Sequence, residues 1–247
     1  MPRYDFRAPR LYVRAPLAAG ATVPLDRAQA HYLGTVLRLT SGQRVLIFNG
    51  RDGEWSATVQ TLKRTATLVA ETRTRPQPVP ADLHYLFAPL KAARLDYMVQ
   101  KAVEMGVSAL QPVLTRHGQV TRVNAERMLA NAIEAAEQCG LLSLPEIRPL
   151  AQLTEVLAAW EPERRLVFCD EDAEVKSPAA ALAGLPPAPL ALLIGPEGGF
   201  STEERDMLLK RPRVVRLSLG PRILRADTAA VAALAVIQAV VGDWRES

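Results

Sequence analysis

The chain has 247 residues, of which 49% are hydrophobic and 23% charged, and its net charge is +4 at pH 7. This length and composition predict one large domain or two smaller ones with a substantial core, and no apolar run is long enough to cross a membrane. Three histidines and two distant cysteines offer little to a metal ion, and unpaired thiols are typical of the cytoplasm. We therefore expect a cytoplasmic protein without membrane association or a metal site.

The N-terminal part of the chain has the pattern of short strands. The predicted strands cover residues 10–13, 44–48, 54–59 and 66–70, with a short helical pattern at 29–39. Turn residues, with two glycines, fill 49–53 between two of the strands. Strands of this length and spacing predict a small barrel.

The charge changes sign near residue 76. Residues 1–75 contain 12 Lys and Arg against 5 Asp and Glu, whereas residues 76–247 contain 18 against 21. Three prolines within 76–80 predict a stiff extended linker at the same place. We expect two domains, 1–75 and 76–247. The basic balance of the first indicates contact with a polyanion, although surface arginines are also common in alanine- and arginine-rich proteins.

The second part of the chain alternates strand and helix patterns. Strands are predicted at 83–87, 109–114, 166–169, 190–194 and 214–219, and helices at 95–105, 124–139 and 228–241. This alternation favours a largely parallel sheet with helices on both faces. The helix at 228–241 is apolar nearly all round, interrupted only by Gln238, so we expect it to be buried on every side, under the sheet or in a dimer interface.

Two glycine loops stand close together near the C-terminal end. Residues 195–200 (Gly-Pro-Glu-Gly-Gly-Phe) follow one strand, and Ser201 and Glu204 form a predicted capping box after them. Gly220 and Pro221 end the next strand. Both loops are expected at the carboxyl edge of the sheet, where α/β proteins bind ligands.

The residues of these loops allow more than one interpretation. Glycines let a ligand approach the backbone, but they also suit a plain strand-to-helix turn. Asp227 or Thr228 is a natural N-cap of the last helix. Apolar Ile223 and Leu224 in a loop, beside arginines, indicate a pocket wall. His117 follows a strand end and is interpreted as a solvated loop residue rather than a catalytic base.

Residues 194–201 and 219–229 together resemble the RsmE family of ribosomal RNA methyltransferases, in the SPOUT superfamily. Supporting matches lie at 31–38, 100–107, 135–138 and 145–147. Two positions depart from the family pattern. Ala226-Asp227 stands where the family has Thr-Glu, and Leu141-Leu142 stands where an arginine is usual. An aspartate keeps the charge of the glutamate.

The resemblance implies a fold and a function. The fold would be an α/β domain with a deep trefoil knot at about 190–230, joined to a PUA-like RNA-binding β-barrel. The protein would be a homodimer that binds S-adenosyl-L-methionine and methylates uridine N3 in the decoding region of small-subunit (16S) rRNA. The alternatives are a SPOUT methyltransferase acting on another RNA, and a non-catalytic RNA-binding dimer.

The resemblance also implies site residues, to which the chemistry of N3 methylation adds two. Arg225 is expected to stabilise the uridine anion, and Asp227 is a weaker candidate to accept its proton. The cofactor-binding residues are expected to be Ile194, Gly195, Glu197, Gly198, Gly199, Leu219, Gly220, Ile223, Leu224 and Thr228. The RNA-binding residues are expected to be Arg3, Arg7, Arg10, Arg38, Lys91, Arg116 and Arg222.

Overall fold

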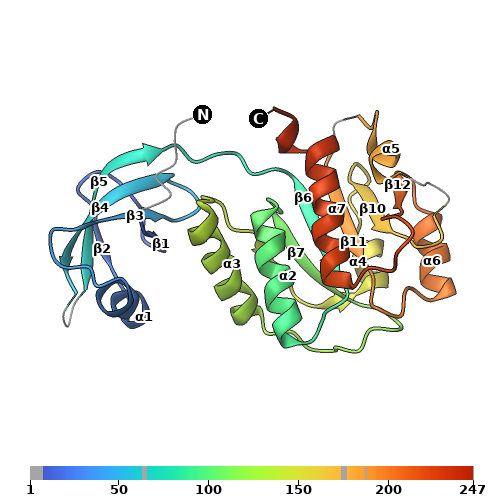
Figure 1. Ribbon diagram of the computed structural model, residues 1–247, viewed down its shortest axis with the longest axis horizontal. Helices are drawn as coiled ribbons and strands as arrows, with labels where there is room; N and C mark the ends of the chain where they lie inside the picture. Colours follow the sequence, from blue (N-terminus) through green and yellow to red (C-terminus); the bar gives the residue numbers. More distant parts are fainter. Residues whose placement is uncertain (1–7, 63–65, 174–176, 187, 247) are drawn as a thin grey trace. The chain divides into compact units, whose positions relative to one another are not determined.

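A computed structural model describes residues 8–62, 66–173, 177–186 and 188–246 (Figure 1). The chain divides into two compact units. One comprises Met1–Val79 together with Ile133–Leu144, and the other comprises Pro80–Ala132 together with Pro145–Ser247. The two ranges expected from the sequence were each continuous. The structure differs in placing residues 133–144 with the N-terminal unit.

The first unit is built on a curled five-stranded sheet. Its order is β1-β3-β4-β5-β2, with β1 and β3 parallel and the other pairs antiparallel. Register shifts between β4 and β5 mark irregularities that increase local twist. The strands are β1 (Arg10–Tyr12), β2 (Thr22–Pro24), β3 (Arg44–Phe48), β4 (Glu54–Thr61) and β5 (Thr67–Arg75), and the helix α1 (Arg27–His31) continues into a π-helical turn at Tyr32–Val36. Alternate strand residues, including Val23, Val45, Ile47, Val59 and Leu68, form its core.

The end of helix α3 (Ala125–Cys139) belongs to this first unit through polar contacts. The Glu137 carboxylate accepts a hydrogen bond from the backbone N–H of Tyr12 at 2.8 Å. Arg75 donates to the Gly140 carbonyl at 2.9 Å, just past the helix end. Such long-range bonds have no local sequence signature, which is why the sequence did not assign this segment to the N-terminal unit.

The second unit contains a parallel sheet of seven strands, which confirms the expected α/β architecture. Six strands follow the order β12-β10-β11-β6-β7-β8. The seventh, β9, lies off this path and pairs with β7. The strands are β6 (Leu83–Phe87), β7 (Ala109–Leu114), β8 (Glu146–Ile147), β9 (Ala151–Gln152), β10 (Arg165–Cys169), β11 (Leu190–Ile194) and β12 (Val214–Leu217). Strands β6 and β11 are buried throughout, as expected for central parallel strands with covered faces.

The helices of the second unit connect these strands (Figure 1). They are α2 (Ala92–Glu104), the first half of α3, α4 (Leu153–Ala158), α5 (Pro178–Leu182), α6 (Thr202–Leu209) and α7 (Ala226–Val240). Helix α6 begins with the predicted capping box, because Ser201 accepts from the Glu204 N–H and Glu204 accepts from the Ser201 N–H. In the described part of the chain, every helix is too short or too polar to cross a bilayer.

Helix α7 packs against α2, α5 and β11 through one face. Ala230, Ala233 and Leu234 on that face are buried. Val231 and Val236, outside the buried set, stay partly exposed. The expectation that α7 is buried on every side therefore does not hold within a single chain.

Gln238, a buried polar residue near the end of α7, contacts backbone groups at two helix ends. It is 1% exposed, its amide Nε2 donates to the Met105 carbonyl at 2.6 Å, and its Oε1 accepts from the Asp243 N–H at 3.1 Å. Met105 directly follows α2, and Asp243 begins the short 3-10 helix Asp243–Glu246 after α7. One side chain therefore satisfies two backbone groups that the helix ends leave unpaired.

Replacing Gln238 with leucine is expected to lower the free energy of unfolding by about 2–4 kcal/mol, because both backbone groups lose their partner inside the protein. Urea unfolding measures this loss. The same substitution at the exposed Gln119 is the matched control, and it is expected to change stability by less than about 0.5 kcal/mol. Equal effects at the two positions would contradict the assigned role.

Candidate active site

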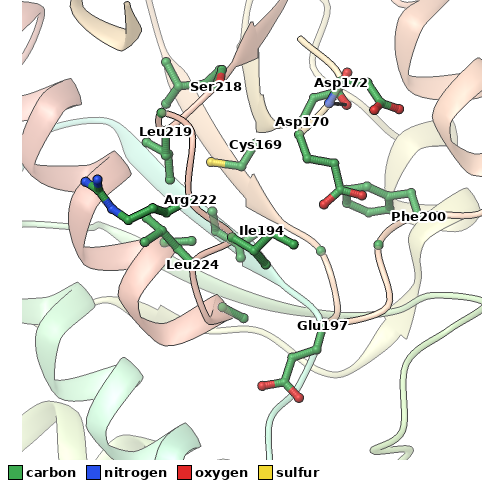
Figure 2. A pocket seen from close by; sticks show the side chains of 18 of the residues that line it. Cys169, Asp170, Asp172, Ile194, Glu197, Phe200, Ser218, Leu219, Arg222 and Leu224 are labelled. Atoms are coloured by element: carbon green, nitrogen blue, oxygen red, sulfur yellow. Dashed lines mark hydrogen bonds between the residues drawn. The ribbon is translucent and has the colours of Figure 1, made fainter. Parts of the chain in front are cut away.

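A pocket of about 350 Å³ lies at the carboxyl edge of the parallel sheet (Figure 2). Its walls are the loops that follow β10, β11 and β12, together with the first turns of α7. Parallel strands bring their carboxyl ends to one edge, so three loops that are distant in sequence meet there. The expectation that the two glycine loops lie together is met by this arrangement.

Most of the expected cofactor-binding residues line this pocket. They are Ile194, Gly195, Glu197, Gly199, Leu219, Gly220, Ile223 and Leu224. Gly198 and Thr228 are not among the lining residues, and neither are Arg225 and Asp227. Arg222, which was expected to contact RNA, is part of the wall.

The pocket combines an apolar wall with an acidic one. Ile194, Leu219 and Leu224 supply aliphatic surface beside Cys169. Burial, and then the nearby Asp170 carboxylate, raises the pKa of the Cys169 thiol to about 12, so the thiol stays neutral. The loop after β10 adds the carboxyl groups at residues 170–172. The lining therefore combines aliphatic side chains with a cluster of carboxylates.

Asp170 holds the loop after β10 against two neighbouring elements. Its side chain is 4% exposed, and it accepts from Arg216 of β12 at 2.6 Å and from Arg205 of α6 at 3.2 Å. Burial opposes ionisation of this carboxyl, but the hydrogen bonds from Arg205 and Arg216 outweigh burial and lower its pKa. The sequence showed only an acidic loop here, whereas the structure shows a fixed ion-pair cluster at the pocket wall.

The first glycine loop folds its own aromatic ring back onto its start. A Cβ atom on Gly195 would lie 2.8 Å from Cε2 of Phe200, so a larger residue at this position would have to displace the ring. The Phe200 ring in turn packs edge-on against Phe168 of β10, with ring centroids 6.1 Å apart. Packing within the loop therefore favours glycine at position 195.

Gly195→Ala is expected to destabilise the protein by about 1–3 kcal/mol, because the added methyl group overpacks the loop and displaces the Phe200 ring. Thermal unfolding measures the effect. A second substitution, Phe200→Leu, shortens the clashing side chain and is expected to recover part of the loss. If Gly195→Ala alone unfolds at the wild-type temperature, the packing assignment is wrong.

The first glycine loop is also held from the segment after β7. Nδ1 of His117 lies 3.2 Å from each of the carbonyl oxygens of Gly198 and Gly199, a distance at which the ring N–H donates to them. The backbone N–H of Arg116 donates to the Glu204 carboxylate at 2.8 Å. His117 is exposed, as expected for a loop residue, but it supports the loop as well.

Helix α7 begins earlier than the sequence indicated. Its first residue is Ala226, and Arg225 takes the N-cap position without a capping side-chain bond. The prediction of Asp227 or Thr228 as N-cap is therefore wrong. Asp227 lies in the first turn, where its carboxylate accepts the Thr228 N–H at 3.0 Å and benefits from the positive end of the helix dipole.

Arg94 of α2 is the principal residue that the sequence analysis missed. Its guanidinium pairs with Asp227 through two hydrogen bonds of 3.0 Å and also with Glu197. The hydrogen bond from Arg94 is the main cause that lowers the pKa of Asp227. These partners lie 103 and 133 residues away in the chain, so no local pattern reveals them.

The expected RNA-binding residues fall into three groups. Arg3 and Arg7 lie outside the described residues. Arg10 is 5% exposed and its Nε atom lies 3.0 Å from the Glu54 carboxylate. The prediction that it contacts RNA is therefore wrong, because burial in an ion pair removes it from the surface. The exposed members of the set are Arg38, Lys91, Arg116 and Arg222.

Comparison with known families covers both units. Residues 77–238 match the RNA methyltransferase domain, and residues 25–71 match the RNA methyltransferase PUA domain. A relative from Rickettsia conorii, ribosomal RNA small subunit methyltransferase E, is 29% identical over 93% of this chain and 94% of its own. The protein of the same name from Synechocystis is 33% identical over 94% of this chain and 78% of its own.

Solved structures show the same architecture. The ribosomal RNA small subunit methyltransferase E of Neisseria gonorrhoeae, bound to S-adenosyl methionine, has a TM-score of 0.85 at 27% identity and covers 96% of this chain and 100% of its own. A Legionella pneumophila methyltransferase with bound SAM has a TM-score of 0.80 at 30% identity, and the match covers 94% of this chain and 98% of its own. With its two matched domains, this chain belongs to the RNA methyltransferase family that includes the ribosomal RNA small subunit methyltransferase E proteins.

Proposed function

We propose that this chain transfers a methyl group from S-adenosyl-L-methionine to N3 of a uridine in the decoding region of small-subunit (16S) rRNA. The observation that carries the proposal is the pocket walled by both glycine loops at the carboxyl edge of the parallel sheet. The names of the relatives supply the class of RNA, and two of the similar structures hold S-adenosyl methionine.

The residues of the pocket fit this cofactor. Leu219 and Leu224 offer an apolar surface for an adenine ring, and the glycine loops expose backbone N–H and C=O groups to read its edge. The loop after β10 brings three carboxylates to the lining, at residues 170–172, against the two arginines Arg205 and Arg222, and this excess of negative charge favours a cationic sulfonium. When bound, the cofactor supplies an electrophilic methyl group.

Two residues next to the pocket have distinct proposed roles. Uridine N3 becomes a good nucleophile only when it loses its proton, and Arg225, exposed at the start of α7, is proposed to stabilise the resulting anion. Asp227 is a weak proton acceptor, because Arg94 lowers its pKa. We therefore propose that Asp227 keeps the start of α7 in place and that the N3 proton leaves to water.

The remaining features of the fold fit an RNA-bound dimer. We propose that residues 1–75 form a PUA-like barrel and residues 76–247 a SPOUT domain, with RNA contacts from Arg38, Lys91, Arg116 and Arg222. Strand β11 lies between β6 and β10, and β12 lies on the other side of β10. We propose that the chain forms a trefoil knot at about 190–230, as its membership of the family suggests. The partly exposed apolar face of α7 supports a homodimer, and the ribosomal substrate supports a cytoplasmic site of action.

Purified protein tests the proposal directly. Calorimetry with S-adenosyl-L-methionine is expected to show binding. Incubation with assembled small subunits, free rRNA and tRNA, followed by mass spectrometry of nucleosides, is expected to show 3-methyluridine in small-subunit rRNA alone. Methylation of tRNA instead would indicate a different RNA target. The absence of both binding and methylation would indicate an RNA-binding dimer that is not an enzyme.

A further inference from the structure

One arginine outside the pocket lining joins the first glycine loop to the start of helix α7, which follows the second glycine loop. Arg94 lies in the first turn of α2. Its Nε and Nη2 atoms donate to the two carboxylate oxygens of Asp227, each at 3.0 Å, while Nη1 donates to Glu197. The guanidinium therefore uses its forked geometry on one carboxylate and its remaining side on a second.

Of the two carboxylates, Glu197 lines the pocket and Asp227 lies outside its lining. Glu197 is in the middle of the first glycine loop, and Asp227 follows directly after the second. Figure 2 shows the Glu197 side chain pointing away from the other labelled residues of the pocket. Arg94 itself does not line the pocket. The link between the first glycine loop and α7 is therefore made by side chains outside the pocket lining, so its effect on the pocket is indirect.

We propose that Arg94 is a positioning residue that ties the first glycine loop to the start of α7, where the second glycine loop ends, and so sets the width of the cofactor pocket. The inference rests on the proposed function for the identity of the ligand, but the link between the loops does not depend on it. The Asp227 side chain is 16% exposed and forms the firm end of the link, and the Glu197 side chain, 51% exposed, forms the weaker end.

The charge of Arg94 and its positioning role predict opposite effects of its removal on the affinity for a cationic ligand, and this difference makes the role testable. The cluster has two carboxylates and one guanidinium, so it carries one net negative charge. Removing Arg94 raises this to two, which by electrostatics favours a cationic ligand. It also leaves the two carboxylates without the bridge that holds their loops. If Arg94 acts by positioning, its loss lowers the affinity for ligands of any charge.

Arg94→Ala tests the link first in the free protein. Hydrogen exchange is expected to become faster in both loops, at residues 195–200 and 219–225. The matched control is Arg127→Ala, which removes another arginine with a two-pronged ion pair, to Asp96, between α2 and α3. The control is expected to leave exchange in both loops unchanged. Unchanged exchange in Arg94→Ala would overturn the proposal even if the wild-type protein binds no S-adenosyl-L-methionine.

Calorimetry with two ligands then separates positioning from charge. S-adenosyl-L-methionine carries one net positive charge and S-adenosylhomocysteine none. Arg94→Ala is expected to weaken both by the same factor of about 10 to 50, which is typical of coupling between neighbouring sites. Arg94→Lys keeps the positive charge but not the forked guanidinium, and its ligand affinity is expected to lie between those of the wild type and Arg94→Ala. Tighter binding of the cationic ligand alone would show that Arg94 acts through charge and would overturn the proposal.

A double-mutant cycle gives an independent readout. Glu197→Gln is expected to weaken ligand binding in the wild-type background but to add little once Arg94 is alanine, because Glu197 acts on the loops through Arg94. Additive effects in the double variant would contradict this. A wild-type protein without affinity for either ligand would refute the proposed function, while the exchange data would still decide on the link.

Discussion

Arg225→Ala is expected to lower the rate of methyl transfer by about 100- to 1000-fold, the usual loss when one group that stabilises a developing anion is removed. The residue precedes α7 beside the second glycine loop, and its side chain is exposed and caps no helix. Its removal is therefore expected to change neither the unfolding temperature nor the affinity for S-adenosyl-L-methionine. The effect falls on kcat, because the positive charge is needed only as uridine N3 becomes an anion.

Single-turnover methylation of small subunits measures this rate, and two variants sharpen the interpretation. Arg225→Lys keeps the charge and is expected to retain part of the activity. Arg222→Ala removes a neighbouring exposed arginine from the same loop, and we expect it to raise the KM for RNA with a smaller change in kcat, since its proposed role is RNA contact. Near-normal turnover of Arg225→Ala would eliminate its assigned role.

Stability is expected to depend on pH through His84, which lies in β6 and is 8% exposed. Burial lowers its pKa to about 4, and the positive charges of Arg164 and Arg148 add to the effect, while Asp82 and Glu161 oppose it. Nδ1 accepts a long hydrogen bond of 3.4 Å from Arg148, which fits a neutral ring. The folded protein therefore keeps His84 neutral at a pH at which an ordinary histidine is charged.

The direction in which stability changes with pH follows from comparing proton binding at His84 in the folded and unfolded states. Below the ordinary pKa of 6.5, the unfolded chain binds a proton at His84 that the folded chain does not bind. This contribution to stability is complete above pH 6.5 and is lost progressively as the pH falls toward 4. Between pH 7.5 and pH 5 it amounts to about 2 kcal/mol, since one pKa unit corresponds to about 1.4 kcal/mol.

Urea unfolding of the wild type and of His84→Gln, at pH 7.5 and pH 5, isolates this effect. The wild type is expected to lose about 2 kcal/mol more than the variant, since glutamine has no proton to gain. His31→Gln changes an exposed histidine and is the matched control. Equal losses in the wild type and His84→Gln would show that His84 does not carry the pH dependence.

The sequence by itself determined those features that depend on neighbouring residues. Apolar runs predicted the buried strands β6 and β11, and alternation with helices predicted the parallel sheet. The Ser201 and Glu204 capping box located the start of α6. Two glycine loops at a characteristic spacing were enough to indicate the family, because the residue types of a loop are set by its own backbone geometry.

Only the tertiary structure decided which distant charges meet. Arg94 and Asp227 are 133 residues apart, and they meet because the order of strands brings α2 beside α7. For the same reason Arg10, which on its own has the character of a surface arginine, is buried against Glu54. Periodicity and capping act over a few residues, whereas an ion pair depends on the whole path of the chain. The glycine loops could therefore be found in the sequence, but the arginine that ties them together could not.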